Sequence, residues 1–169
     1  MLANLSLPVS LETAASILLR RATADDLSAL MTLLSDDPIS AARGDRAHDA
    51  DAAAYARALD EIVRDPANDV IVAVNADGDI VATMQLTRIP GMARQGATRL
   101  LIEAVRVDSA RRSSGVGSAM MRWVTDTAAP AIGAQLVQLT SDEARTDAHR
   151  FYERLGFVGS HRGFKYPIE

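Results

Sequence analysis

The chain contains no cysteine, only 3 histidines and few aromatic residues, which make up 4% of its 169 residues. The absence of cysteine excludes disulfide bonds, thiolate zinc sites and cysteine nucleophiles. The three histidines (His48, His149 and His161) are too scattered for a histidine metal site, so we expect no bound metal. No basic run with interleaved aromatic residues is present, and we therefore expect no nucleic-acid partner.

Long hydrophobic runs are also missing from the sequence. No stretch approaches the roughly 18 uninterrupted apolar residues that a membrane helix needs. Residues 1–21 lack the positively charged start and the apolar segment of a secretory signal. We therefore expect a cytoplasmic protein without membrane attachment.

The composition that remains is that of one globular domain, with 48% hydrophobic and 24% charged residues. Periodicity predicts strands over residues 16–21, 70–74, 80–88, 98–107 and 136–139, with an extended segment from 157. Helices are predicted over about 23–34, 49–64, 113–129 and 145–155. This order predicts an α/β (α+β) domain over residues 16–169, in which about four helices flank a mixed sheet of about six to seven strands. Residues 1–15 are expected to form an N-terminal extension.

The charge is distributed unevenly along the chain. Residues 22–79 carry 4 arginines against 13 acidic residues, whereas residues 80–169 carry 12 basic residues against 8 acidic ones. Such a split suits a site that binds one cationic and one anionic partner, although solvated surface charge produces it as well.

A turn rich in glycine follows the strand predicted over 98–107. Gly115 and Gly117 stand where a helix begins, so backbone N–H groups and the positive end of the helix dipole are available to a phosphate, with Arg111 and Arg112 close by in sequence. The dinucleotide fingerprint fails because Met120 occupies its third glycine position. This pattern predicts a pyrophosphate pocket, although such glycines also occur as turn or packing residues.

Two blocks of sequence resemble the GNAT superfamily of N-acetyltransferases. Residues 112–117 (RSSGVG) resemble its acetyl-coenzyme A motif, Arg/Gln-x-x-Gly-x-Gly/Ala, and residues 148–157 (AHRFYERLGF) resemble its late helix and strand. The resemblance covers roughly Ile17 to the C-terminus and implies acetyl-CoA as co-substrate. The segment 147–152, together with Ser160 and His161, is also similar to aminoalkylphosphonate N-acetyltransferases.

The resemblance implies a site. Backbone groups of the Val105-Arg106-Val107 strand would pair with the pantetheine arm, and the Val105 N–H would stabilise the oxyanion. The N–H groups that would hold the pyrophosphate belong to Arg112, Ser113, Ser114, Gly115, Val116, Gly117 and Ser118. Tyr152 would protonate the leaving thiolate, or else pack in the core. Arg145 replaces an Asn of many members and is either a phosphate contact or a surface residue.

Glu103 is our candidate for the base that accepts the amine proton. It alternates onto the same strand face as Leu101 and Val105, where burial would favour the neutral carboxyl and make a better base. The alternative is a structural carboxylate paired with Arg99 or Arg106.

The acceptor is the least defined partner. In relatives the first two helices frame its entrance, and here they lie in the acidic region, so we predict a cationic amine with Asp36, Asp37 and Asp45 as contacts. The phosphonate resemblance instead suggests an anionic amine and a role for His161. His149 is expected to face outward, and a C-terminal strand, Phe164 to Ile168, is expected to pair with a second subunit in a homodimer.

The function expected from these features is acetyl transfer from acetyl-CoA to a primary amine of a small molecule or a peptide. The transfer would be direct, in a ternary complex, because no cysteine can form an acyl-enzyme. The alternative is an acetyl-CoA-binding sensor or interaction module without turnover.

Overall fold

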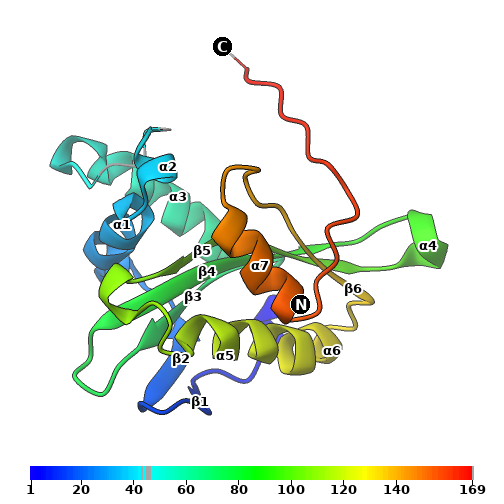
Figure 1. The fold of residues 1–169 in the computed structure, drawn as a ribbon, viewed down its shortest axis with the longest axis horizontal. Coiled ribbons are helices and arrows are strands. Elements are labelled where there is room, and N and C mark those ends of the chain that lie inside the picture. The colour runs from blue at the N-terminus through cyan, green and yellow to red at the C-terminus, as the bar shows by residue number, and fades with distance from the viewer. Residues whose placement is uncertain (43, 45–46, 169) are drawn as a thin grey trace.

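A computed structural model describes residues 1–42, 44 and 47–168. Its centre is one six-stranded sheet in the order β1-β2-β3-β4-β5-β6, as predicted for a mixed α/β fold (Figure 1). Successive strands pair antiparallel up to β5, and β6 joins β5 in parallel. The strands are β1 (Val9–Leu11), β2 (Ile17–Arg21), β3 (Asn68–Val74), β4 (Ile80–Ile89), β5 (Arg99–Val107) and β6 (Leu136–Leu139).

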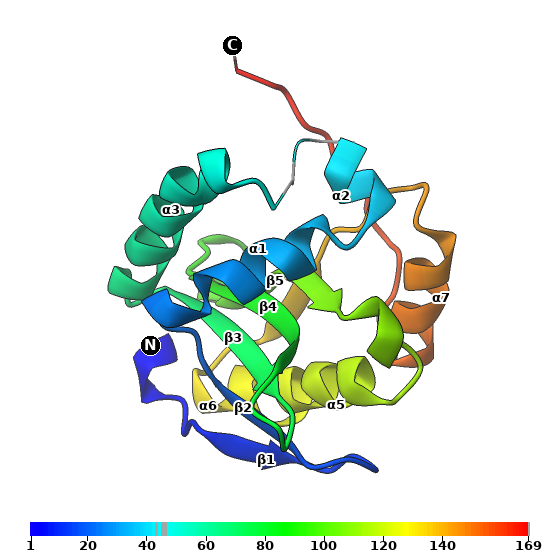
Figure 2. The same ribbon diagram turned by 90° about the vertical axis from the view of Figure 1, so that its left-hand side faces the viewer.

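Helices cover both faces of this sheet. Figure 2 shows α1 and α3 on one side of the sheet and α5 with α6 on the other, while α7 lies at the edge of the molecule. The α-helices are α1 (Leu27–Ser35), α2 (Pro38–Ala42), α3 (Ala52–Arg64), the short turn α4 (Ala93–Gly96), α5 (Val116–Trp123), α6 (Ala129–Ala131) and α7 (Thr146–Arg154). A π-helical turn (Val124–Ala128) joins α5 to α6, and short 3-10 turns span Leu2–Asn4, Ala24–Asp26, Asp49–Asp51 and Ser109–Arg111.

Local sequence explains where the first helix begins. The Thr23 N–H donates to the Asp26 carboxylate at 2.7 Å, and the two residues form a capping box in front of α1. The same carboxylate accepts two hydrogen bonds from Arg20, at 2.6 and 2.8 Å, which lower the pKa of Asp26 against the opposing effect of its burial. The helix start is therefore tied to β2 by an ion pair whose carboxylate is buried.

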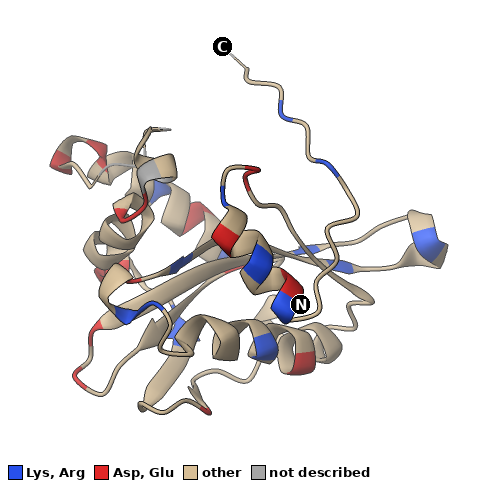
Figure 3. Cartoon of the chain, viewed as in Figure 1, with Lys and Arg blue, Asp and Glu red and all other residues tan. Residues whose placement is uncertain are grey.

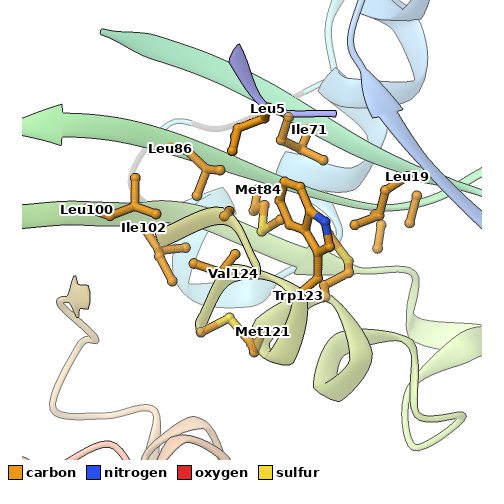
Figure 4. Close-up of a cluster of buried hydrophobic side chains, with 14 of the residues drawn as sticks. Leu5, Leu19, Ile71, Met84, Leu86, Leu100, Ile102, Met121, Trp123 and Val124 are labelled. Atoms are coloured by element: carbon orange, nitrogen blue, oxygen red, sulfur yellow. The ribbon is translucent and has the colours of Figure 1, made fainter. Parts of the chain in front are cut away.

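The main core lies between the sheet and α5. Figure 4 shows Trp123 and Val124 facing Met84 and Leu86 of β4 and Ile102 of β5. A smaller cluster on the other face joins alternate residues of β3 to α1 and α3, because successive side chains of a strand point to opposite faces. Both faces of β3 are buried in this way.

Residues 1–15, set apart above as an extension, are packed into the same sheet and core. Leu2 is 0% and Leu5 5% exposed, and β1 pairs with β2. The Arg21 guanidinium donates to the Leu2 carbonyl at 2.8 Å and also to the Leu5 carbonyl, while its Nε donates to buried Asp69. This N-terminal segment thus contributes directly to the folded core.

Two predicted segments differ in the structure. The segment between the helices predicted over 23–34 and 49–64 contains an additional short helix, α2. The strand predicted at Phe164 to Ile168 is absent from the described C-terminal residues: the tail runs away from the body (Figure 1), and Phe164 and Tyr166 are 89% and 87% exposed. Within one chain the described residues of the tail pair with no other strand, and their pairing with a second subunit stays a prediction. Among the described helices, none is both long and apolar enough to cross a membrane.

Candidate active site

Strand β5 is interrupted halfway along its length. Arg99–Ile102 pair with β4 on one side and with β6 on the other, but β6 ends at Leu139 and pairs no further. The register with β4 shifts between Thr83 and Gln85, and Ala104 takes a φ of +50°. A bulge at Ala104 therefore separates a half of β5 that is bonded on both sides from a half whose β6 side is open.

The open half leads into the β5–α5 loop (residues 108–115), whose backbone is shaped for an anion. Ser113 and Gly115 have φ values of +65° and +89°, and both residues are exposed. No described side chain caps the N-terminus of α5, so the N–H groups of its first turn point out of the helix without an intrahelical partner. These groups and the helix dipole can bind a phosphate.

The two glycines of the motif serve different purposes. Gly115 has the left-handed conformation that favours glycine. Gly117 has an ordinary φ, but a Cβ there would lie 3.3 Å from Val107 Cγ2 and 3.6 Å from Phe151 Cζ. Glycine at 117 thus lets α5 pack closely against β5 and α7.

The Arg112 side chain is held by neighbouring backbone. Its Nη2 donates to the Asp36 carbonyl at 2.8 Å and its Nε to the Val107 carbonyl at 3.4 Å. The side chain therefore fastens the β5–α5 loop to the end of α1.

Tyr152 lies on the inner face of α7. Its ring makes edge contacts with Phe151 and Phe157, at centroid distances of 5.2 and 5.9 Å, and it packs against the main core. Burial raises the pKa of the Tyr152 phenol, opposed by the positive charges of Arg106 and Arg145. The phenol therefore stays protonated at neutral pH and can donate a proton. Core packing and proton donation, weighed above as alternatives, are compatible here.

Arg145 is mostly buried and bound to an acid of the same chain. Its two Nη atoms donate to the two carboxylate oxygens of Asp37, one of them at 2.8 Å. It is therefore not the surface arginine considered above, and its guanidinium is already bound by a carboxylate.

The acids predicted to contact the acceptor are used within the chain. The Asp36 carboxylate accepts the Ser109 N–H at 2.9 Å and lies 3.6 Å from Arg112 Nη2. Asp36 and Asp37 thus pair with arginines, because the acidic and basic parts of the sequence meet here in the fold; Asp45 lies outside the described residues. Figure 3 shows acidic residues over α3 and the end of α1, with basic residues along α4 and the tail.

Glu103 and His149 differ from prediction, whereas the role suggested for His161 stays a prediction. Glu103 is exposed and lies opposite Gln85 of β4, so its predicted burial is wrong. The strand face that carries Glu103 is left uncovered at this position, just before the bulge. His149 is half-buried, with Nε2 2.8 Å from the Asp142 carbonyl, and does not simply face outward. His161 lies in the exposed tail next to Ser160.

Sequence reasoning missed the bulge and the Asp36-Asp37 connection. No residue type marks the bulge, because Ala104 carries no turn signal. The uneven charge along the chain did signal the second feature, but a sum over residues does not show which acid meets which arginine.

Known proteins resemble this arrangement. The sequence model of the Acetyltransferase (GNAT) family matches residues 27–157. Over 53 residues the chain is 42% identical to an aminoalkylphosphonate N-acetyltransferase from Salmonella typhimurium, which covers 31% of this chain and 34% of that protein. The match with this curated relative thus spans only about a third of its length.

Solved structures agree over nearly the whole chain. A crystal structure described as a transcriptional regulator from Bacillus halodurans is 40% identical with a TM-score of 0.84, covering 90% of this chain and 99% of that one. An acetyltransferase from Trypanosoma brucei is 26% identical with a TM-score of 0.71, again covering 90% and 99%. From the family match and these folds, the chain belongs to the GNAT family of acetyltransferases.

Proposed function

We propose that this chain is a cytoplasmic N-acetyltransferase that moves the acetyl group of acetyl-CoA directly to the primary amine of a small molecule in a ternary complex. The observation that carries the proposal is the half-buried, protonated Tyr152, which packs against the same core cluster as Val105 and Val107 of the open half of β5. A proton donor beside an open strand edge is what release of a thiolate requires.

The co-substrate fits the chain's own groups. The uncapped start of α5 and the exposed loop before it would hold the pyrophosphate through the N–H groups of residues 112–118. The open half of β5, Val105-Arg106-Val107, would pair with the pantetheine arm, since its β6 side has no ladder partner beyond Ile102. Arg145 enters this proposal through Asp37 rather than as a direct phosphate contact.

The chemistry divides among three groups. The amine nitrogen attacks the thioester carbonyl, a C–N bond forms, the C–S bond breaks, and Tyr152 gives its proton to the departing sulfur. The Val105 N–H would stabilise the oxygen that gains charge. Glu103 would take the amine proton, directly or through water, because it lies on β5 immediately before the bulge at Ala104.

We further propose an acceptor that carries an anionic group. Asp36 and Asp37 are engaged by arginines, which removes the reason to expect a cation. Two arginines, Arg106 and Arg145, act electrostatically on Tyr152, and the matched relative from Salmonella typhimurium is an aminoalkylphosphonate N-acetyltransferase. An amine bearing a phosphonate or phosphate combines both features.

A homodimer is part of this proposal. Phe164, Tyr166 and Ile168 are 89%, 87% and 86% exposed at alternating positions of the tail, and a second copy would cover them. Light scattering on the full chain, compared with Phe164→Ser, tests this: a dimer that the substitution leaves unchanged would contradict the role of the tail.

One finding favours the sensor alternative. The 40% identical structure from Bacillus halodurans is described as a transcriptional regulator. A regulator of this fold would bind acetyl-CoA without releasing thiol.

One experiment separates the two functions. Calorimetric titration with acetyl-CoA is followed by a thiol-release assay on aminoalkylphosphonates, aminoglycosides, polyamines, amino acids and basic peptides. Turnover with the phosphonates above all others supports the proposal. Binding without turnover supports the sensor, and faster turnover of polyamines would contradict the anionic acceptor.

A further inference from the structure

Two consecutive aspartates connect the end of α1 to two distant parts of the site. Asp36 and Asp37 lie just after α1, and their partners are 73 to 108 residues further along the chain. Asp36 binds the β5–α5 loop, and Asp37 binds the start of α7. Adjacent carboxylates thus hold the two elements that the proposed function assigns to the phosphate and to the proton.

The Asp37 contact is the more enclosed of the two. The side chains of Arg145 and Asp37 are 21% and 14% exposed, against 55% and 37% for Arg112 and Asp36. Two parallel N–H···O contacts fix the plane of the Arg145 guanidinium as well as its position. The Asp37 pair is therefore built to orient its arginine, and the Asp36 pair is more open to solvent.

Arg145 in turn sits where it affects α7. It is the N-cap of that helix: its N–H donates to the Asp142 carbonyl at 3.0 Å and its carbonyl accepts the His149 N–H at 3.1 Å. Its charge reaches Tyr152, where it and Arg106 of β5 lower the pKa of the phenol against the larger effect of burial. The guanidinium that Asp37 orients is thus electrostatically coupled to the proposed acid.

We propose that Asp37 is a positioning residue for acetyl transfer, which holds Arg145 in place at the start of the helix that carries Tyr152, while Asp36 separately positions the β5–α5 loop. This inference rests on the proposed function, because it needs Tyr152 as the proton donor. The two neighbouring acids then have separable effects. Loss of Asp37 affects the chemical step, and loss of Asp36 affects binding of the co-substrate.

A titration of Tyr152 tests the coupling without any substrate. The chain has 3 tyrosines, so the background Tyr55→Phe with Tyr166→Phe leaves only Tyr152, which is labelled with fluorotyrosine and followed by fluorine NMR against pH. Arg145→Met removes a positive charge and raises the Tyr152 pKa. Asp37→Asn releases Arg145 and raises it as well, and the double variant raises it no further than Arg145→Met does.

Opposite results overturn the inference. If Arg145 stays in place without its partner, Asp37→Asn lowers the Tyr152 pKa, because a negative charge is lost. No shift, or additive shifts in the double variant, would also contradict the role of Asp37. Asp36→Asn is the matched control, and we expect it to leave this titration unchanged.

Kinetics provide the second readout. We expect Asp37→Asn to lower kcat by about 10- to 100-fold with little change in acetyl-CoA affinity, because a displaced catalytic group loses that much. Asp37→Glu, which keeps the carboxylate, restores part of kcat. Asp36→Asn weakens acetyl-CoA binding instead. Equal loss of kcat in both variants contradicts the inference, whereas a wild-type protein without turnover contradicts the proposed function and leaves the titration to decide on Asp37.

Discussion

The two halves of β5 belong to the same strand but differ in their neighbours and in their proposed roles. Arg99–Ile102 are bonded to β4 and β6, and Leu100 and Ile102 are 0% and 1% exposed. Beyond the bulge, Arg106 and Val107 pair with β4 alone, and Val105, Arg106 and Val107 are all half-buried. The first half is bonded to a strand on each side and stabilises the fold, whereas the second has no β6 partner on its outer side. One residue in an unusual conformation, Ala104, separates them.

The largest effect should come from the open half. We expect Tyr152→Phe to lower kcat by about 10²- to 10⁴-fold, because the phenol proton is lost while the ring packing remains. Thiol release at saturating substrates measures this, and the melting temperature is the control. Burial raises the pKa of Tyr152 above its ordinary value of 10.0, so the phenol keeps its proton below that pH. Deprotonation of Tyr152 should therefore cause no loss of wild-type activity below pH 10.0. Full activity in Tyr152→Phe would remove the proposed acid.

Substitutions in the half of β5 that is bonded on both sides should change the free energy of unfolding. Ile102→Ala leaves a cavity in the main core and should lower the free energy of unfolding by about 2–5 kcal/mol, measured by urea denaturation. Ile102→Val is the matched control and should cost about 0.5–1.5 kcal/mol. Activity per folded molecule should remain close to that of the wild type. A large loss of kcat at normal stability would show that the two halves are not separate.

Two ion pairs extend this comparison. Asp26→Asn breaks a pair whose carboxylate is only 8% exposed and should cost about 2–3 kcal/mol, since hydrogen bonds to charged groups are lost. Asp36→Asn, in the exposed pair with Arg112, should cost about 0.2–1 kcal/mol. Urea denaturation compares them, and equal costs would contradict the difference in burial.

The Asp26 effect should also depend on pH. Because the folded-state pKa of Asp26 is lowered by Arg20, its contribution is present above the unfolded-state pKa, about 3.9, and is lost as the pH falls through the lower folded-state value. The stability difference between wild type and Asp26→Asn should therefore shrink on acidification below about pH 4. If the stability difference instead grows below that pH, the pKa of Asp26 is raised rather than lowered in the folded state.

The smallest effect concerns the bulge itself. Ala104 has a φ of +50°, which glycine tolerates better. Ala104→Gly should raise the free energy of unfolding by only about 0.5 kcal/mol, since relief of backbone strain is partly offset by the greater entropy of glycine in the unfolded chain. A more mobile bulge should lower kcat modestly. A loss of stability in Ala104→Gly would instead show that the Ala104 methyl group makes favourable packing contacts in the folded protein.

A second substitution tests the base. Glu103→Gln should lower turnover and alter the acidic limb of the pH–rate profile. If both remain unchanged, Glu103 is not the base, and the exposed position of its carboxylate would be the reason.

Local signals predicted much of this fold. Alternation and amphipathic periodicity placed five of the strands and the helices α1, α3, α5 and α7, and the capping box of Thr23 lies at the start of the helix predicted over about 23–34. β1 was missed because three residues are too short for a period to show. The pairing of Phe164 to Ile168 with a second subunit stays a prediction, because alternation shows that a segment can pair but not which partner edge reaches it.

The candidate site was predictable only in part. The turn at Gly115 and Gly117 and the helix that carries Tyr152 follow from spacing, because conformation and dipole act within a few residues. Glu103 was placed on a buried face that the structure leaves exposed, since a strand period does not say where the neighbouring strand ends.

By itself, the sequence determined which segments form strands and helices, which turn can bind a phosphate and which family the chain resembles, because these depend on contacts within a few residues. The opening of β5 at Ala104, the ion pairs of Asp36 and Asp37 with arginines, and the half-buried position of Tyr152 come from the tertiary structure alone. Those features depend on groups up to 108 residues apart, and the electrostatic interaction between such groups is set by distance and burial in the folded chain.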